Sequence, residues 1–151
     1  MTFLTLVVTA AHVFAAAVWF GAMAYSLAVV QPRVERVLGG RAEELLVILG
    51  SGARWKVVGL IGVLAASGVG LVLLAPGDGA LWWASVVASA VALVAATAVF
   101  CVVSWRMWPA RVFALPGELP AHRRRFRLVA WTMLTLTGAA TAFGVLAHVS
   151  R

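Results

Sequence analysis

Charged residues, acids and cysteines are all scarce in this chain of 151 residues. Only 11% of the residues are charged, against about 25% in a typical soluble domain, which excludes a water-solvated globule. Cys101 is the only cysteine, so an intramolecular disulfide and a zinc site of paired cysteines are excluded. No carboxylate lies in the long apolar runs, which argues against a pump driven by a buried acid.

The motifs of common hydrolases are also missing. The chain contains no glycine-rich loop followed by Lys-Ser or Lys-Thr, and no Gly-x-Ser-x-Gly. Nucleotide hydrolysis by a P-loop and acyl transfer by a nucleophile elbow therefore lack their sequence signatures.

Apolar residues make up 64% of the chain and form four runs without a charge, at 3–30, 57–75, 80–105 and 128–149. About 20 apolar helical residues cross a bilayer core of roughly 30 Å. Membrane-spanning strands would instead alternate polar and apolar residues over short segments. The sequence therefore predicts an all-α, integral membrane four-helix bundle, with residues 1–151 as a single transmembrane domain.

The net charge of +7 follows from the way the cations flank the apolar runs. Eleven of the twelve cations lie in or beside the two long connections, and the turn at 76–79 has none. By the positive-inside rule, both connections are cytoplasmic and both termini lie outside. We expect a multi-pass protein of a bacterial-type cytoplasmic membrane.

Partners are predicted mainly from the basic connections. Anionic lipid headgroups are expected at Arg123, Arg124, Arg125 and Arg127, at about 1 kcal/mol per cation. Nucleic acid is not expected, because these charges lie against the inner leaflet. Small residues on the helices allow a homodimer or a partner membrane subunit. Residues 34–49 are expected either to lie on the membrane surface as a short helix or to extend the second span.

His12 is the most informative residue because it lies inside the first apolar run, roughly 13 Å below its outer end. An ionisable side chain at that depth is a candidate functional residue. A neutral imidazole can bind a metal or haem iron, or relay a proton. The alternative is a histidine bonded to Ser or Thr of a neighbouring helix. Trp19 and Tyr25, further along the run, are candidate walls of a cofactor site or packing residues.

Sulfur and nitrogen ligands for copper are spread over the other runs. Copper(I) favours thioether, thiolate and imidazole ligands, and the candidates besides His12 are His148, Met23, Met133 and Cys101. They predict a relay of copper across the membrane, or else methionines that fill gaps in the packing. Haem between His12 and His148 is not expected, since their depths differ by about 10–12 Å.

A faint internal repeat links the second and fourth runs. Each begins with a basic-aromatic-basic triplet, at 54–56 and 125–127, and each contains a hydroxyl-glycine pair further on, at 67–68 and 137–138. The pattern indicates either a duplication or two similar interfacial anchors.

The segment His12, Trp19, Phe20, Gly21 and Tyr25 resembles the first helix of small four-helix bacterial membrane proteins. One such family is copper resistance protein D (CopD), and another is the HemJ-type protoporphyrinogen oxidase. Resemblance to CopD implies copper binding or transport with His12 as a ligand.

Resemblance to HemJ implies haem b on His12, a pocket wall at residues 19–21 and a lysine in the outer part of the third helix. Residues 81–85 contain no lysine. The leading expectation is therefore a CopD-like protein, more a copper carrier than an enzyme. A haem-dependent membrane oxidoreductase and a cofactor-free accessory subunit are the alternatives.

Overall fold

The computed structural model describes residues 2–50, 52–115 and 117–150, and these are almost entirely helical with no strand among them. Four helical segments are long and apolar enough to cross a membrane, which confirms the predicted four-helix membrane bundle. The elements along the chain are α1 (Phe3–Tyr25), the π-helical turn η1 (Ser26–Val30), α2 (Gln31–Leu38), η2 (Gly39–Arg41), α3 (Ala42–Gly50), α4 (Ala53–Leu74), α5 (Ala80–Val102), the π-helical turn η3 (Val103–Met107), α6 (Trp108–Val112) and α7 (Leu119–Val149).

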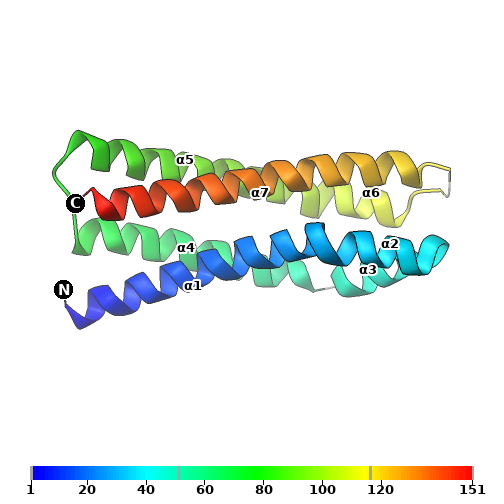
Figure 1. Cartoon of the computed structure of the whole chain (residues 1–151), viewed down its shortest axis with the longest axis horizontal. Helices are drawn as coiled ribbons and strands as arrows, with labels where there is room; N and C mark the ends of the chain where they lie inside the picture. Colours follow the sequence, from blue (N-terminus) through cyan, green and yellow to red (C-terminus); the bar gives the residue numbers. More distant parts are fainter. Residues whose placement is uncertain (1, 51, 116, 151) are drawn as a thin grey trace.

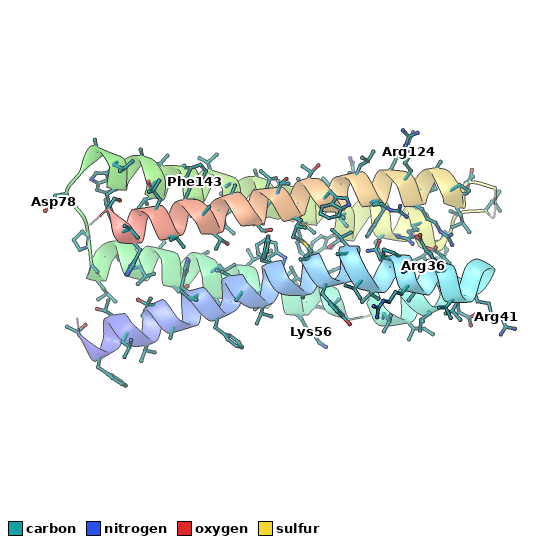
Figure 2. The ribbon with its side chains drawn as sticks, viewed as in Figure 1. Arg36, Arg41, Lys56, Asp78, Arg124 and Phe143 are labelled. Atoms are coloured by element: carbon teal, nitrogen blue, oxygen red, sulfur yellow. The ribbon has the colours of Figure 1, made fainter. Side chains whose placement is uncertain are left out.

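The bundle has two chemically different ends (Figure 1). The N- and C-termini and the turn between α4 and α5 lie at one end, which we call the terminal end. At the other end lie α2, α3, α6 and the start of α7, with most of the cations, and we call it the basic end. Figure 2 shows Asp78 at the terminal end and Arg36, Arg41 and Arg124 at the basic end.

The helices associate mainly as two pairs, α1 with α4 and α5 with α7. The pairs are joined in the core by a cluster of Ala15, Trp19, Leu64 and Ala96, with Leu136 of α7 packed against it. Most other large apolar side chains are exposed on the outside of the bundle, as expected for surfaces in contact with lipid.

All four long helices extend beyond the apolar runs at the basic end, and the second begins at Ala53, four residues before its run. The first continues to Leu38, the third to Val112, and the fourth begins at Leu119. Pro32 and Pro109 stand in the first turn of α2 and α6, each just after a π-helical turn. A proline ring clashes with the carbonyl four residues earlier, so the wider π turn lets the helix continue instead of ending.

The segment 34–49 differs from both expectations. Within this segment α2 ends at Leu38. A separate helix, α3, then returns alongside α2 toward α4. Gly39 and Gly52 have positive φ angles of 50° and 73°, a conformation that glycine adopts without steric cost. α3 is therefore neither an isolated surface helix nor a simple extension of α4, and it buries Ala42 and Leu46.

The two pairs share several buried positions, which favours the duplication over the alternative of two similar interfacial anchors. With Pro32 aligned on Pro109, every buried residue of α1 and η1 falls on a buried residue of α5 or η3: Thr5 on Trp82, Ala15 on Ala92, Trp19 on Ala96 and Leu27 on Ser104. With Gly68 aligned on Gly138, the buried Leu64 and Ser67 fall on the buried Leu134 and Thr137. The bundle therefore consists of two similar helical pairs.

Candidate functional site

His12 lies between α1 and α4, on the helix face that points into the bundle. Ala15 and Trp19, which follow it at helical spacing, are both buried in the core. Opposite the ring is Gly68, where a Cβ atom would lie 3.4 Å from Cε1 of His12. The glycine thus makes room for the imidazole, which is itself half-buried.

A chain of hydrogen bonds links the imidazole of His12 to the backbone of α4. The Nδ1 atom of His12 lies 2.8 Å from Oγ of Ser67, and that hydroxyl donates to the carbonyl of Val63 at 2.5 Å. A serine hydroxyl has one proton, so at the imidazole it accepts. We infer that Nδ1 of His12 is protonated, and that in the neutral ring the lone pair lies on Nε2.

The contact with Ser67 is the serine bond that the sequence offered as the alternative to a functional histidine. The two interpretations are compatible, because histidines that ligate metals commonly donate their second N–H to an oxygen of the protein. Ser67 can play this part, because its hydroxyl oxygen lies within hydrogen-bond distance of Nδ1 of His12.

The two aromatic candidates have different environments. Trp19 is only 4% exposed and packs against Leu64 and Ala96, so its ring is part of the bundle core. Tyr25 is 61% exposed and lies at the end of α1. The structure does not bring Tyr25 together with His12.

The candidate copper ligands are not gathered around His12. His148 and Cys101 are exposed on the outside of α7 and α5, and Met23 lies about 16 Å further along the first helix, at 1.5 Å per residue. Met133 is buried in α7, next to Leu134 of the cluster that contacts Met23. Among the described residues, no group of three or more His, Cys, Asp or Glu is able to hold a metal ion.

The second helical pair has a polar contact at the position that corresponds to His12. The aligned residue in α5 is Ser89, whose hydroxyl donates to the carbonyl of Ala140 in α7 at 2.8 Å. Each pair therefore has a polar side chain that bridges its two helices, and the first pair has an imidazole there. Nothing in the sequence alone distinguished Ser89 from the other hydroxyl residues of its helix.

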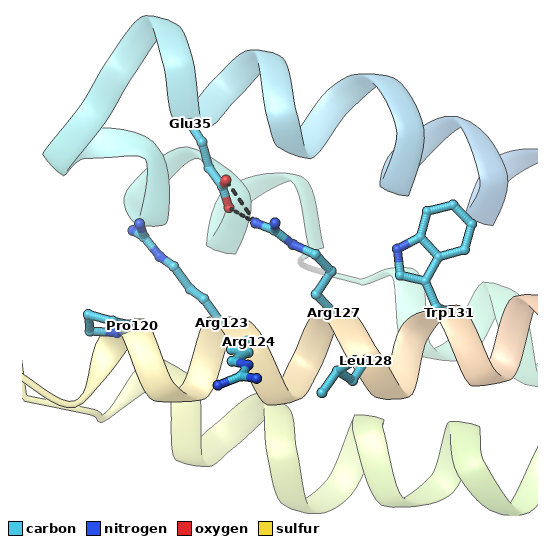
Figure 3. Close-up of a pocket in the computed structure, with 7 residues that line it drawn as sticks. All are labelled: Glu35, Pro120, Arg123, Arg124, Arg127, Leu128 and Trp131. Carbon is cyan, nitrogen blue, oxygen red and sulfur yellow. Dashed lines mark hydrogen bonds and ion pairs between the residues drawn. The ribbon is translucent and has the colours of Figure 1, made fainter.

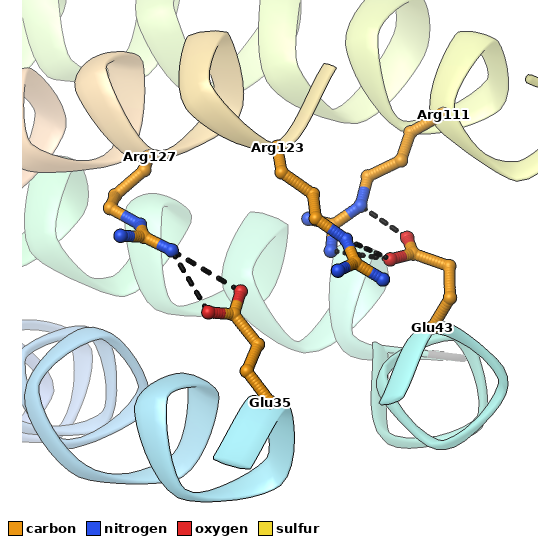
Figure 4. Close-up of polar contacts among 5 residues, drawn as sticks. All are labelled: Glu35, Glu43, Arg111, Arg123 and Arg127. Carbon is orange, nitrogen blue, oxygen red and sulfur yellow. Dashed lines mark hydrogen bonds and ion pairs between the residues drawn. The ribbon is translucent and has the colours of Figure 1, made fainter. Parts of the chain in front are cut away.

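The basic end is held together by an ion-pair network (Figure 4). Arg111 is 5% exposed at its side chain and pairs with both carboxylate oxygens of Glu43, while Arg123 donates from Nε to the same carboxylate at 3.0 Å. Arg127 pairs with Glu35, also at 3.0 Å. These contacts tie α2 and α3 to α6 and α7. The sequence predicted these arginines as topology signals and as contacts for lipid headgroups, but it did not predict the network.

The pKa of Glu43 reflects this network. Burial alone would raise the pKa of this carboxyl group, but hydrogen bonds and charge attraction from Arg111 and Arg123 outweigh burial and lower it below the usual value. Glu43 is therefore ionised at neutral pH and holds both guanidinium groups.

Two of the four arginines expected to bind lipid already have carboxylate partners, namely Arg123 and Arg127. Arg124 and Arg125 are exposed and make no ion pair within the described part of the chain.

Comparison with known proteins returned no matching family model, curated protein or solved structure.

Proposed function

We propose that this chain is a CopD-like multi-pass protein of a bacterial-type cytoplasmic membrane, in which His12 binds copper in transit across the bilayer. The basic end faces the cytoplasm, and His12 lies in the outer half of the membrane. The proposal rests on one observation, the hydrogen-bonded chain from His12 through Ser67 to Val63.

The chain of hydrogen bonds supports metal binding because it leaves Nε2 of His12 as a ligand with a fixed ring orientation. An interior imidazole is a suitable ligand for copper. Among the described residues His12 belongs to no group of three or more His, Cys, Asp or Glu, so the ion is held weakly and small ligands that enter with it complete its coordination. Weak binding suits passage better than storage.

Haem b on His12 is the second candidate, because the same orientation of the ring suits an axial ligand of haem iron. The fit around His12 is poor for a porphyrin, since Gly68 packs against the ring and Trp19 is buried in the core. Two hollows of about 360 and 370 Å³ lie at the basic end, and His12 lines neither.

The test is metal analysis and an absorption spectrum of the full chain, purified in detergent from cells supplied with copper. We expect copper in the wild-type protein, loss in His12→Ala and no change in His122→Ala, which removes a histidine at the basic end. Ser67→Ala keeps the ligand but frees the ring, and should lower copper affinity about 10- to 100-fold.

Each other outcome assigns a different function. Copper that is absent, or unchanged in His12→Ala, contradicts the proposal. A Soret band lost in His12→Ala establishes the haem alternative. A preparation with neither group and a stable co-purifying protein indicates an accessory subunit.

A further inference from the structure

A groove of about 360 Å³ opens at the basic end between α2 and the first turns of α7 (Figure 3). We call it the arginine groove. The residues that matter for its chemistry are Glu35, Arg123, Arg124, Arg127, Leu128 and Trp131.

The arginine groove has an excess of positive charge, with three guanidinium groups and one carboxylate. Arg127 is paired with Glu35, and Arg123 uses its Nε to contact Glu43. Arg124 lies at the rim, exposed and without an ion pair among the described residues. The remaining N–H groups of Arg123 and the whole guanidinium of Arg124 are thus available to an anion.

Polarity changes along the groove in the direction of the membrane. Leu128 and Trp131 follow the arginines on α7, about one turn nearer the bilayer centre, and Leu128 is 60% exposed. The indole of Trp131 points from α7 toward the first helix (Figure 3). Cations followed by an exposed apolar surface match the depth profile of a lipid leaflet, in which phosphate lies outside the acyl chains.

We infer that the arginine groove binds an anionic glycerophospholipid from the leaflet at the basic end. Arg124 and the free N–H groups of Arg123 contact the phosphate, and Leu128 and Trp131 contact the first part of an acyl chain. Arg127 stays with Glu35 and keeps α2 in place as the far wall. This site is independent of copper and of His12.

A second groove provides a comparison, because its arginine is already bonded within the protein. It has about 370 Å³ and lies between the start of α4 and the segment from α5 to α6, which is the place equivalent to the arginine groove when the two helical pairs are exchanged. Its cation, Arg54, donates to the backbone carbonyl of Ser104 and lies 4.9 Å from the ring centre of Trp105. With its guanidinium already engaged, this groove should not select an anionic lipid.

The test uses the full chain in nanodiscs that contain equal amounts of phosphatidylglycerol and phosphatidylcholine, followed by native mass spectrometry of retained lipid. We expect the wild-type protein to retain phosphatidylglycerol preferentially. Arg124→Gln should reduce that retention about fivefold, and Arg124→Lys should largely preserve it. Arg36→Gln is the matched control, because it removes one exposed charge at the same end outside the groove.

The competing outcomes are distinct. Equal retention of the two lipids, or equal losses in Arg124→Gln and Arg36→Gln, would show only general surface charge and overturn the site. Displacement of phosphatidylglycerol by excess inorganic phosphate would show a site for a free anion, which also overturns the assignment to lipid. Retention that is insensitive to phosphate supports it.

Discussion

At the scale of single residues, the hydroxyl of Ser67 lies 2.8 Å from Nδ1 of His12 and carries the inference about the tautomer of the ring. The sequence predicted His12 as the candidate ligand, because one ionisable side chain in an apolar run is costly without a role. The sequence did not predict its partner, because several hydroxyl residues lie at similar depth and only packing selects one. The role of Gly68 is also visible only in the structure, where the imidazole ring of His12 packs against it.

The turn between α4 and α5 offers a test of packing at one residue. A Cβ atom at Gly77 would lie 2.7 Å from the ring of Trp82, which is 1% exposed and has no room to move. Gly77→Ala should therefore destabilise the protein by about 1–3 kcal/mol, measured as a lower thermal unfolding midpoint in detergent.

The matched control for Gly77→Ala is Gly62→Ala. Gly62 has nothing within 4 Å of its Cβ position, and alanine is the better helix former by up to about 1 kcal/mol. Gly62→Ala should keep or raise the midpoint. Equal effects of the two substitutions would refute the close contact at Gly77.

At the scale of elements, charge-free runs predicted the four spans because bilayer thickness sets the length of an apolar helix. Such runs carry no information about where polar helices end, and the structure extends all four spans at the basic end. The break between α2 and α3 depends on the conformation of Gly39, and the break between α3 and α4 on that of Gly52. The attachment of α3 depends on Glu43, whose partners come from α6 and α7.

The attachment of α3 predicts the effect of Glu43→Gln. This change leaves Arg111 buried without a carboxylate partner, and breaking a buried pair from one side can cost about 3–5 kcal/mol. Part of that cost is screened, because Arg123 and Glu43 are not fully buried. We expect faster amide hydrogen exchange in α3, while Glu44→Gln, an exposed neighbour on the same helix, should change little.

The pH dependence of α3 follows from the lowered pKa of Glu43. A carboxyl group whose pKa is lower in the folded state stabilises that state above its unfolded pKa, and the contribution is lost as pH falls through the folded value. Protection of α3 should therefore be constant near neutral pH. It should begin to fall below about pH 4.5, the ordinary glutamate value, and Glu43→Gln should remove this acid step. An acid step of the same size in the variant would contradict the role of Glu43.

At the scale of the whole molecule, the two helical pairs share their π turns, the prolines that follow these turns and several buried positions. The sequence showed only the basic triplets and the hydroxyl-glycine pairs of this repeat. The correspondence of the first and third helices was missed in the sequence because, apart from Pro32 and Pro109, their side chains differ: Trp19 aligns with Ala96, and His12 with Ser89. Because the first pair has His12 where the second has Ser89, the first pair can specialise in binding a metal ion.

The orientation of the molecule is tested by labelling single cysteines in intact cells. On a Cys101→Ser background, Gly79→Cys at the terminal end should react with a membrane-impermeant maleimide. Arg41→Cys at the basic end should react only after the cells are lysed, because the positive-inside rule places that end in the cytoplasm. The reverse pattern would contradict the orientation.

The central claim, that His12 presents Nε2 as a metal ligand, is tested most directly by nitrogen NMR of the full chain labelled with ¹⁵N-histidine. Spectra are recorded before and after copper(I) is added, and the three histidines are assigned with single alanine variants. We predict that His12 is protonated at Nδ1 alone and that copper(I) shifts its Nε2 resonance. A proton on Nε2, or a copper shift confined to His122 or His148, would contradict the claim.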